Sequence, residues 1–163
     1  MRITFGNAKI LLHLSAIALV AVPAWATDDD SSTMSQEGCA MSAREVVDQF
    51  IDLFYVKKEV RLAFETWVHP DYIQHKPSLP DGREPVIVFL EKLLERFPDR
   101  TFTIHRVISS DDLVAVHCHS QATPEDLGFA VVDIFRVEDC HMVEHWDVVQ
   151  SVPAHSENDN TMF

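Results

Sequence analysis

The sequence predicts an α+β fold, in which three N-terminal helices pack on an antiparallel or mixed sheet. Three observations lead to this prediction. Apolar residues recur at helical spacing in three segments before residue 98, the period changes to two after residue 100, and the later segments are joined by short polar turns rather than by helices. Helices followed by a run of strands are typical of α+β domains and disfavour an alternating βαβ arrangement.

Residues 1–26 have the composition of a secretory signal peptide. Arg2 and Lys9 form a short basic region, an apolar run extends from Ile10 to Val22, and Ala24-Trp25-Ala26 fits a small-x-small cleavage site. A helix needs roughly 20 apolar residues to span a bilayer, so this shorter run disfavours a stable membrane anchor. We therefore expect an exported protein, periplasmic or secreted.

Composition sets limits on the domain count and on the partners. Removal of 26 of the 163 residues leaves 137, which suits one domain, and the loss of Arg2 and Lys9 changes the formal net charge from −13 to −15. Nucleic acid and anionic membranes repel such a chain, and the sequence shows no basic patch for an anionic substrate. Cys39, Cys118 and Cys140 allow one disulfide plus a thiol or three thiols, and Cys118 has the surroundings of a buried strand residue.

Helical spacing begins at residue 42, after an acidic, Ser-rich segment (27–41) that is expected to be a flexible leader. Ser42-Ala-Arg-Glu45 has the form of a capping box and predicts the start of the first helix. His69-Pro70 ends the second helix, and Pro98 ends the third. The three apolar stripes contain Val46, Val47, Phe50, Ile51 and Phe54; Val60, Ala63, Phe64 and Trp67; and Val86, Phe89, Leu90, Leu93, Leu94 and Phe97.

Four segments with a period of two then predict strands. They are Thr101–Ile108, Leu113–Gln121, Phe129–Val137 and Met142–Gln150. A short extended segment, 71–76, precedes the third helix. The domain is thus expected over residues 42–152, followed by a tail, 153–163, that lies free or packs through Met162 and Phe163, either over the sheet or across a partner.

Asp133 is the main functional lead, because this acid lies between Val132 and Ile134 in an apolar strand. A two-residue turn at Asp139-Cys140 predicts a hairpin in which Asp133 lies opposite Trp146. The same register places Phe135 opposite Glu144, so that two acids would share one face with aromatic groups. His145 and Asp147 would form a polar pair on the other face.

Four motifs together resemble those of the SnoaL-like polyketide cyclases, a branch of the nuclear-transport-factor-two-like superfamily, over residues 44–152. They are Tyr72-Ile-Gln-His75-Lys-Pro77, His117-Cys-His119, Val132-Asp133-Ile-Phe135-Arg136 and Val143-Glu-His-Trp146-Asp147. The resemblance implies a strongly curved sheet and helices that form a cone around an apolar pocket, usually in a homodimer that packs through the outer sheet face. It also implies activity without cofactor or metal.

The resemblance also implies site residues. Asp133 would act as an acid or base, or donate a hydrogen bond to an enolate oxygen, with His119 beside it. His75 occupies a place where ketosteroid isomerases keep an Asp base, so the identity of the base stays open between His119 and His75. Further pocket residues would be Trp146, His117, Glu144 and Tyr72. Burial favours the neutral form of a carboxylic acid, which can then donate to an oxygen that gains charge.

The predicted function is therefore cofactor-independent acid–base catalysis on a small apolar carbonyl compound: enolisation followed by aldol-type cyclisation, isomerisation or dehydration. Two other classes stay open. His117 and His119, two apart on one strand, could bind a metal together with His75, Asp133 or Glu144. Alternatively, the domain could be a non-catalytic ligand-binding or dimeric interaction module, because one fold can serve many functions.

Overall fold

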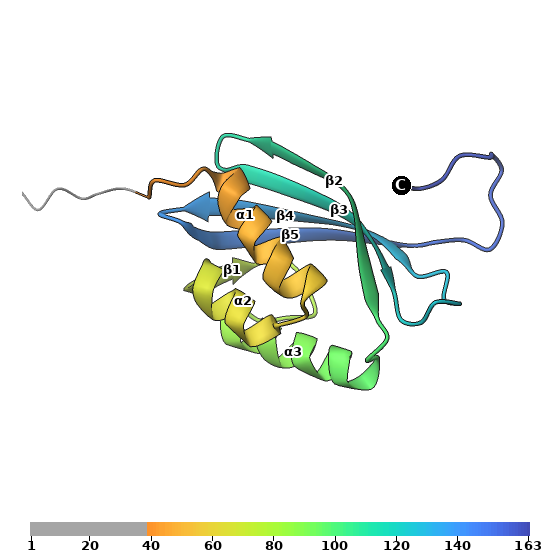
Figure 1. Cartoon of the computed structure of the whole chain (residues 1–163), viewed down its shortest axis with the longest axis horizontal. Helices are drawn as coiled ribbons and strands as arrows, with labels where there is room; N and C mark the ends of the chain where they lie inside the picture. Colours follow the sequence, from red (N-terminus) through yellow and green to blue (C-terminus); the bar gives the residue numbers. More distant parts are fainter. Residues whose placement is uncertain (1–38) are drawn as a thin grey trace, which may run out of the picture. The chain divides into compact units, whose positions relative to one another are not determined.

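The computed structural model describes residues 39–163, and these form three helices on one face of a five-stranded sheet (Figure 1). The predicted signal peptide and residues 27–38 of the predicted leader lie outside the described residues. The helices are α1 (Ala43–Ile51), α2 (Val60–Trp67) and α3 (Arg83–Arg96). The strands are β1 (Val68–Gln74), β2 (Thr101–Ser110), β3 (Leu113–Gln121), β4 (Phe129–Glu138) and β5 (His141–Ser151).

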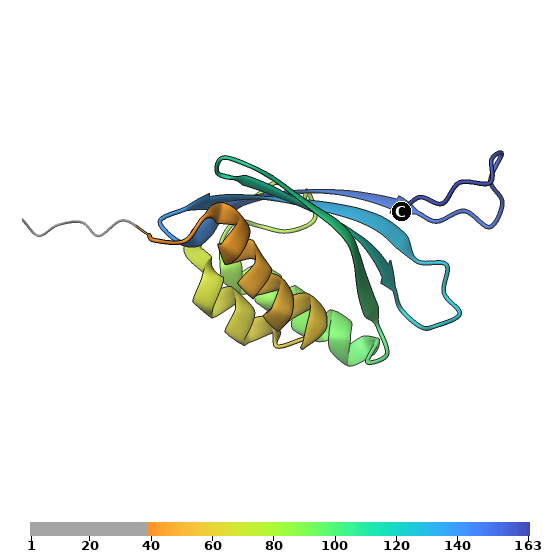
Figure 2. The same cartoon turned by 45° about the horizontal axis from the view of Figure 1, so that its top comes forward.

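The strand order is β1-β5-β4-β3-β2, with β1 parallel to β5 and all other pairs antiparallel. Figure 2 shows the three helices together below the sheet, and β2 bends toward the end of α3, so the sheet curls around the helices without closing. The predicted α+β class with a curved mixed sheet is confirmed. Residues 71–74 of the extended segment expected at 71–76 belong to the strand β1, which begins directly after α2.

The first helix carries the predicted capping box and then widens. Ser42 Oγ accepts a hydrogen bond from the Glu45 backbone N–H at 3.3 Å, and Glu45 Oε2 accepts one from the Ser42 N–H at 2.8 Å. After α1 the chain continues as a π-helical segment, η1 (Asp52–Val56). Because this turn is wider than an α-helical turn, both Phe54 and Tyr55 are buried on the side of the sheet.

The β4–β5 hairpin has the predicted two-residue turn but not the predicted register. Asp139 and Cys140 both have positive φ, 45° and 62°, as a type I′ turn requires. A β-bulge follows, however: Val137 pairs with Met142 whereas Arg136 pairs with Glu144, so Val143 is one extra residue.

The bulge inverts the face of every later β5 side chain. Asp133 lies opposite Asp147 and Phe135 lies opposite His145. The expected pairs of Asp133 with Trp146 and of Phe135 with Glu144 are therefore wrong. The expected polar pair of His145 and Asp147 on the outer face is wrong for the same reason, since both residues face the helices.

A disulfide joins Cys39, just before α1, to Cys140 in the β4–β5 turn, with 5.3 Å between the Cα atoms, and Cys118 is a free, buried thiol. The sequence alone leaves this pairing open. No helix among residues 39–163 is both long and apolar enough to cross a membrane.

The C-terminal tail folds over the sheet face opposite the helices (Figure 2). The Phe163 ring packs on His105, His117 and His119, with centroid distances of 4.7, 5.6 and 4.4 Å. Of the arrangements that the sequence allows for the tail, the structure has the one in which Phe163 lies on the sheet.

Candidate active site

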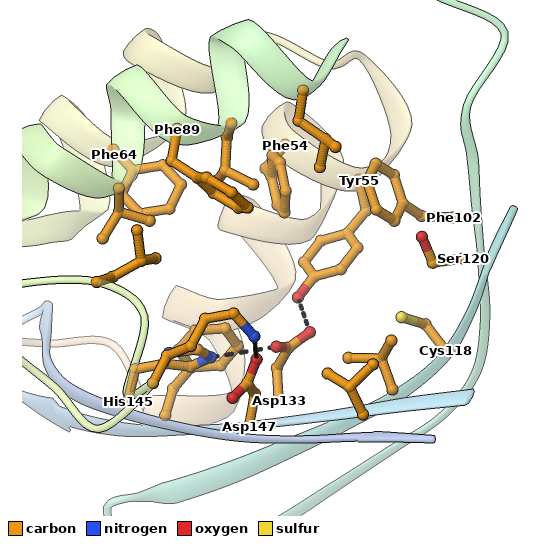
Figure 3. A pocket seen from close by; sticks show the side chains of 18 of the residues that line it. Phe54, Tyr55, Phe64, Phe89, Phe102, Cys118, Ser120, Asp133, His145 and Asp147 are labelled. Atoms are coloured by element: carbon orange, nitrogen blue, oxygen red, sulfur yellow. Dashed lines mark hydrogen bonds and ion pairs between the residues drawn. The ribbon is translucent and has the colours of Figure 1, made fainter. Parts of the chain in front are cut away.

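A cavity of about 210 Å³ lies between the helices and the inner face of the sheet. Its wall is largely apolar, with aromatic rings from α1, η1, α2, α3 and β2 (Figure 3). Nine polar side chains interrupt this wall: Tyr55, Tyr72, Gln74, Lys76, Arg100, Ser120, Asp133, His145 and Asp147. An apolar cavity with a few convergent polar groups is the usual form of a small-molecule site.

Asp133 lies at the centre of the polar wall and has two hydrogen-bond partners (Figure 3). The Tyr55 hydroxyl donates to Asp133 Oδ2 at 2.6 Å, and His145 Nε2 lies 3.1 Å from Asp133 Oδ1. The side chain of Asp133 is 14% exposed and that of His145 is 10% exposed. Arg136, three residues further along β4, pairs with Glu144 on the outer face and not with Asp133.

Gln74 determines which nitrogen of His145 carries a proton. Its Oε1 accepts the Lys76 backbone N–H at 2.9 Å and lies 3.0 Å from His145 Nδ1. A carbonyl oxygen can only accept, so Nδ1 must be the donor. Nε2 then faces Asp133 either as the bare nitrogen of a neutral imidazole against a carboxylic acid, or as an N–H against a carboxylate. One proton is therefore shared between His145 and Asp133.

Two tyrosines and a phenylalanine hold this pair in place. The His145 ring is stacked between Phe135 and Tyr72, with centroid distances of 5.1 and 6.1 Å. Burial, followed by the neighbouring charge of Asp133, raises the pKa of Tyr55 well above its ordinary value, and the same two causes raise the pKa of Tyr72. Tyr55 therefore keeps its proton and remains a hydrogen-bond donor to Asp133.

A second acid, Asp147, lies beside Asp133 on β5 and forms an ion pair with Lys76 (Figure 3). The side chains of Lys76 and Asp147 are 25% and 12% exposed. Because Lys76 balances the charge of Asp147, the wall does not hold two uncompensated carboxylates next to each other.

Of the predicted site residues, Asp133 and Tyr72 line the cavity. His75, Glu144 and Trp146 come together on the outer face instead: the His75 ring stacks on Trp146 at 4.8 Å, and His75 Nε2 lies 2.8 Å from Glu144 Oε1. The bulge at Val143 turns Glu144 and Trp146 to the outer face. Their predicted positions in the pocket are therefore corrected.

His117 and His119 also lie on the outer face, because the inner side chains of β3 are Val116, Cys118 and Ser120. His119 Nε2 lies 2.8 Å from the Leu127 carbonyl oxygen. The structure thus brings neither His119 nor His75 to Asp133. Among residues 39–163 no group of three His, Cys, Asp or Glu side chains is arranged to hold a metal ion, so the alternative metal site gains no support there.

The sequence reasoning missed His145, Tyr55 and Gln74. The register expected from the two-residue turn places His145 on the outer face, because the bulge has no obvious sequence signal. Tyr55 falls outside the 3.6-residue stripe of α1, and only a π-helical turn brings it inward. Gln74 could have been found, since Tyr72 and Gln74 alternate on one face of a strand.

Comparisons with known proteins agree with this architecture. Residues 47–145 match the SnoaL-like domain. IdmH from Streptomyces antibioticus, named as a proposed polyketide cyclase, is 20% identical, with a TM-score of 0.56 over 69% of this chain and 96% of IdmH. AclR from Streptomyces galilaeus, named as a proposed hydroxylase, is 19% identical, with a TM-score of 0.57 over 68% of this chain and 80% of AclR.

A search of curated proteins gives no match. At these identities the solved structures establish the fold alone, a cone of the nuclear-transport-factor-two-like type. The match to the SnoaL-like domain covers more than half of the sequence and includes α2, α3 and most of the sheet. The chain therefore belongs to the SnoaL-like family.

Proposed function

We propose that this protein catalyses cofactor-independent acid–base chemistry on a small carbonyl compound, by enolisation followed by aldol-type cyclisation, isomerisation or dehydration. The observation that carries the proposal is the hydrogen-bonded chain Gln74–His145–Asp133–Tyr55 in the wall of an apolar cavity. Asp133 is the acid–base group, and His145 takes the place beside it that the sequence assigned to His119 or His75.

The first step begins with the proton on His145 and a carboxylate at Asp133. Each carboxylate oxygen has one hydrogen-bond partner and a second lone pair for the substrate. Asp133 removes a proton from the carbon next to the carbonyl: the C–H bond breaks, an O–H bond forms, and the electron pair moves to the carbonyl oxygen. The substrate becomes an enolate, and Asp133 becomes a carboxylic acid.

The second step returns the proton. In isomerisation, Asp133 gives it to another carbon of the enolate. In ring closure, the enolate carbon attacks a second carbonyl, and Asp133 protonates the new alkoxide. His145 and Tyr55 stay in contact with both forms of Asp133, so the proton moves without rearrangement of the wall.

The enolate oxygen needs a donor, and Gln74 offers one. Its Nε2 is buried and has no hydrogen-bond partner within residues 39–163, although its Oε1 has two. A buried donor without a partner costs free energy until a ligand supplies an acceptor. We assign the Gln74 amide as the donor that holds the substrate oxygen.

The proposal is tested by exchange of the α-protons of a carbonyl probe with solvent deuterium. The probe is 2-acetylnaphthalene, followed by NMR. Asp133→Asn should reduce catalysed exchange by about a hundredfold or more, as loss of a general acid–base group does. The amide can still accept from Tyr55 and donate to His145, so circular dichroism should show an intact fold.

The exposed acid Asp159 provides a matched control, and Asp159→Asn should exchange like the wild type. Wild-type exchange by Asp133→Asn would remove Asp133 from the mechanism. Binding of the probe without exchange in the wild type would favour the second candidate, a non-catalytic ligand-binding module, which the same apolar cavity supports.

We also infer that the protein is exported. The Cys39–Cys140 disulfide supports this inference, because disulfides persist mainly in oxidising compartments.

A further inference from the structure

One cation of the cavity wall takes no part in the chemistry above. Arg100, just before β2, is 8% exposed and lines the cavity. Its Nη1 donates to Ser120 Oγ at 2.6 Å, whereas its Nε is buried and has no hydrogen-bond partner within residues 39–163. A buried guanidinium is retained in proteins when a negative group pairs with it.

The described part of the chain supplies no such negative group in contact with Arg100. No carboxylate of residues 39–163 lies within ion-pair distance of its guanidinium. Burial lowers the pKa of Arg100, and the charge of Asp126 opposes this shift only from a distance. Asp126 instead holds its own loop, since its two carboxylate oxygens accept the backbone N–H groups of Ala122 and Gly128 at 2.9 and 3.0 Å.

The Phe97 ring, with its centroid 5.4 Å from Arg100 Cζ, covers one side of the guanidinium. A cation–π contact stabilises the charge but satisfies no N–H donor. The remaining donors and the Ser120 hydroxyl thus form a small polar site in an apolar wall. A carboxylate matches the planar fork of a guanidinium better than a neutral oxygen does.

We infer that Arg100 and Ser120 form a subsite for a carboxylate, and that the substrate is an elongated carbonyl compound with a carboxylate at its far end. This inference rests on the proposed function, because it assigns the reacting carbonyl and the carboxylate to one substrate in the cavity. The absence of a basic patch in the sequence does not exclude this ligand, because a single buried arginine is enough to pair with one carboxylate.

The register sets the length of that substrate. Val116 pairs with Asp133, and Ser120 lies four residues further along β3 on the same face. Strand residues rise about 3.3 Å each, so the subsite is roughly 13 Å along the sheet from the acid–base pair. A bicyclic aromatic ketone with the carboxylate on the second ring reaches from the acid–base pair toward the Arg100–Ser120 subsite.

The test compares the binding of 6-acetyl-2-naphthoate with that of neutral 2-acetylnaphthalene, by calorimetry on the purified protein. The wild type should bind the carboxylate at least about tenfold more tightly, a factor typical of a charge-assisted hydrogen bond. Arg100→Gln should abolish this preference and leave the affinity for the neutral ketone within about twofold. Ser120→Ala should weaken the preference for the carboxylate.

Arg96 is the matched control, because its Cζ also lies 5.4 Å from the Phe97 centroid but its side chain is exposed. Arg96→Gln should keep the full preference. Equal affinity for the two probes in the wild type, or a preference that persists in folded Arg100→Gln, overturns the subsite. Asp133→Asn separates the two proposals: it should lose proton exchange and keep the carboxylate preference.

Discussion

At the scale of single residues, the protonation of the site follows from one backbone group. The Lys76 N–H fixes the orientation of the Gln74 amide, the amide oxygen requires a proton on His145 Nδ1, and this leaves Nε2 facing Asp133. Tyr55 completes the chain at the other carboxylate oxygen. His145 Nδ1 is thus a fixed donor, and one proton is left for His145 Nε2 and Asp133 to share before any substrate is bound.

Tyr55→Phe removes the hydroxyl that donates to Asp133 and keeps the ring that packs against Phe54 and Phe102. We expect the free energy of unfolding at pH 7 to fall by about 1.5–3 kcal/mol, the usual contribution of a hydrogen bond to a charged group. Urea titration measures this change. An unchanged stability would mean that the hydroxyl does not support the ionised carboxylate.

At the scale of elements, the sequence predicts the capping box at Ser42, the helices, the four antiparallel strands and the place of Asp133 in an apolar strand. Their signals are local, since they depend on period and turn residues. The strand register is not local. One extra residue, Val143, exchanges the faces of Glu144 and His145, and no side chain at the bulge marks it.

The positions of η1 and β1 also depend on packing that no local sequence signal indicates. A π-helical turn brings Tyr55 inward although α-helical spacing excludes it, and β1 joins the sheet beside β5, the last strand of the chain. The site therefore could be predicted as a location around Asp133, but its partners depend on long-range packing.

The corrected register predicts the behaviour of Glu144. Arg136 and His75 lower the pKa of Glu144 below its ordinary value of 4.5. A carboxyl with a lowered folded-state pKa stabilises the fold above its unfolded value, and this contribution is lost as the pH falls through the folded value. Glu144→Gln should therefore be less stable than wild type at pH 7, and the difference should shrink below pH 4.5.

Thermal melts at both pH values measure that difference. Because Glu144 lies outside the cavity, its variant should keep α-proton exchange within about twofold of wild type, as a change outside the site does. Loss of exchange in folded Glu144→Gln would instead indicate the unshifted register, with Glu144 in the pocket.

At the scale of the whole molecule, the disulfide joins the segment before α1 to the far end of the β4–β5 hairpin, across a sequence separation of 101 residues. Closure of so long a loop restricts the unfolded chain strongly. The link also connects the first described residue of the chain to the hairpin that carries Asp133 and His145.

Cys39→Ser should lower the free energy of unfolding by about 2–4 kcal/mol. Urea titration under oxidising conditions measures this loss, and the wild type with excess dithiothreitol should behave like the variant. Identical midpoints for oxidised wild type and Cys39→Ser would show that the link does not form, and would remove the support that it gives to export.

The central claim is that His145, not His119, works with Asp133, and the most direct measurement compares these two histidines. We would measure deuterium incorporation into 2-acetylnaphthalene by His145→Gln and His119→Gln. His145→Gln should reduce catalysed exchange by about a hundredfold or more, because its amide cannot hold the proton that leaves Asp133 as a carboxylate, whereas His119→Gln should stay near wild type. Loss in folded His119→Gln together with full exchange by His145→Gln would contradict the account.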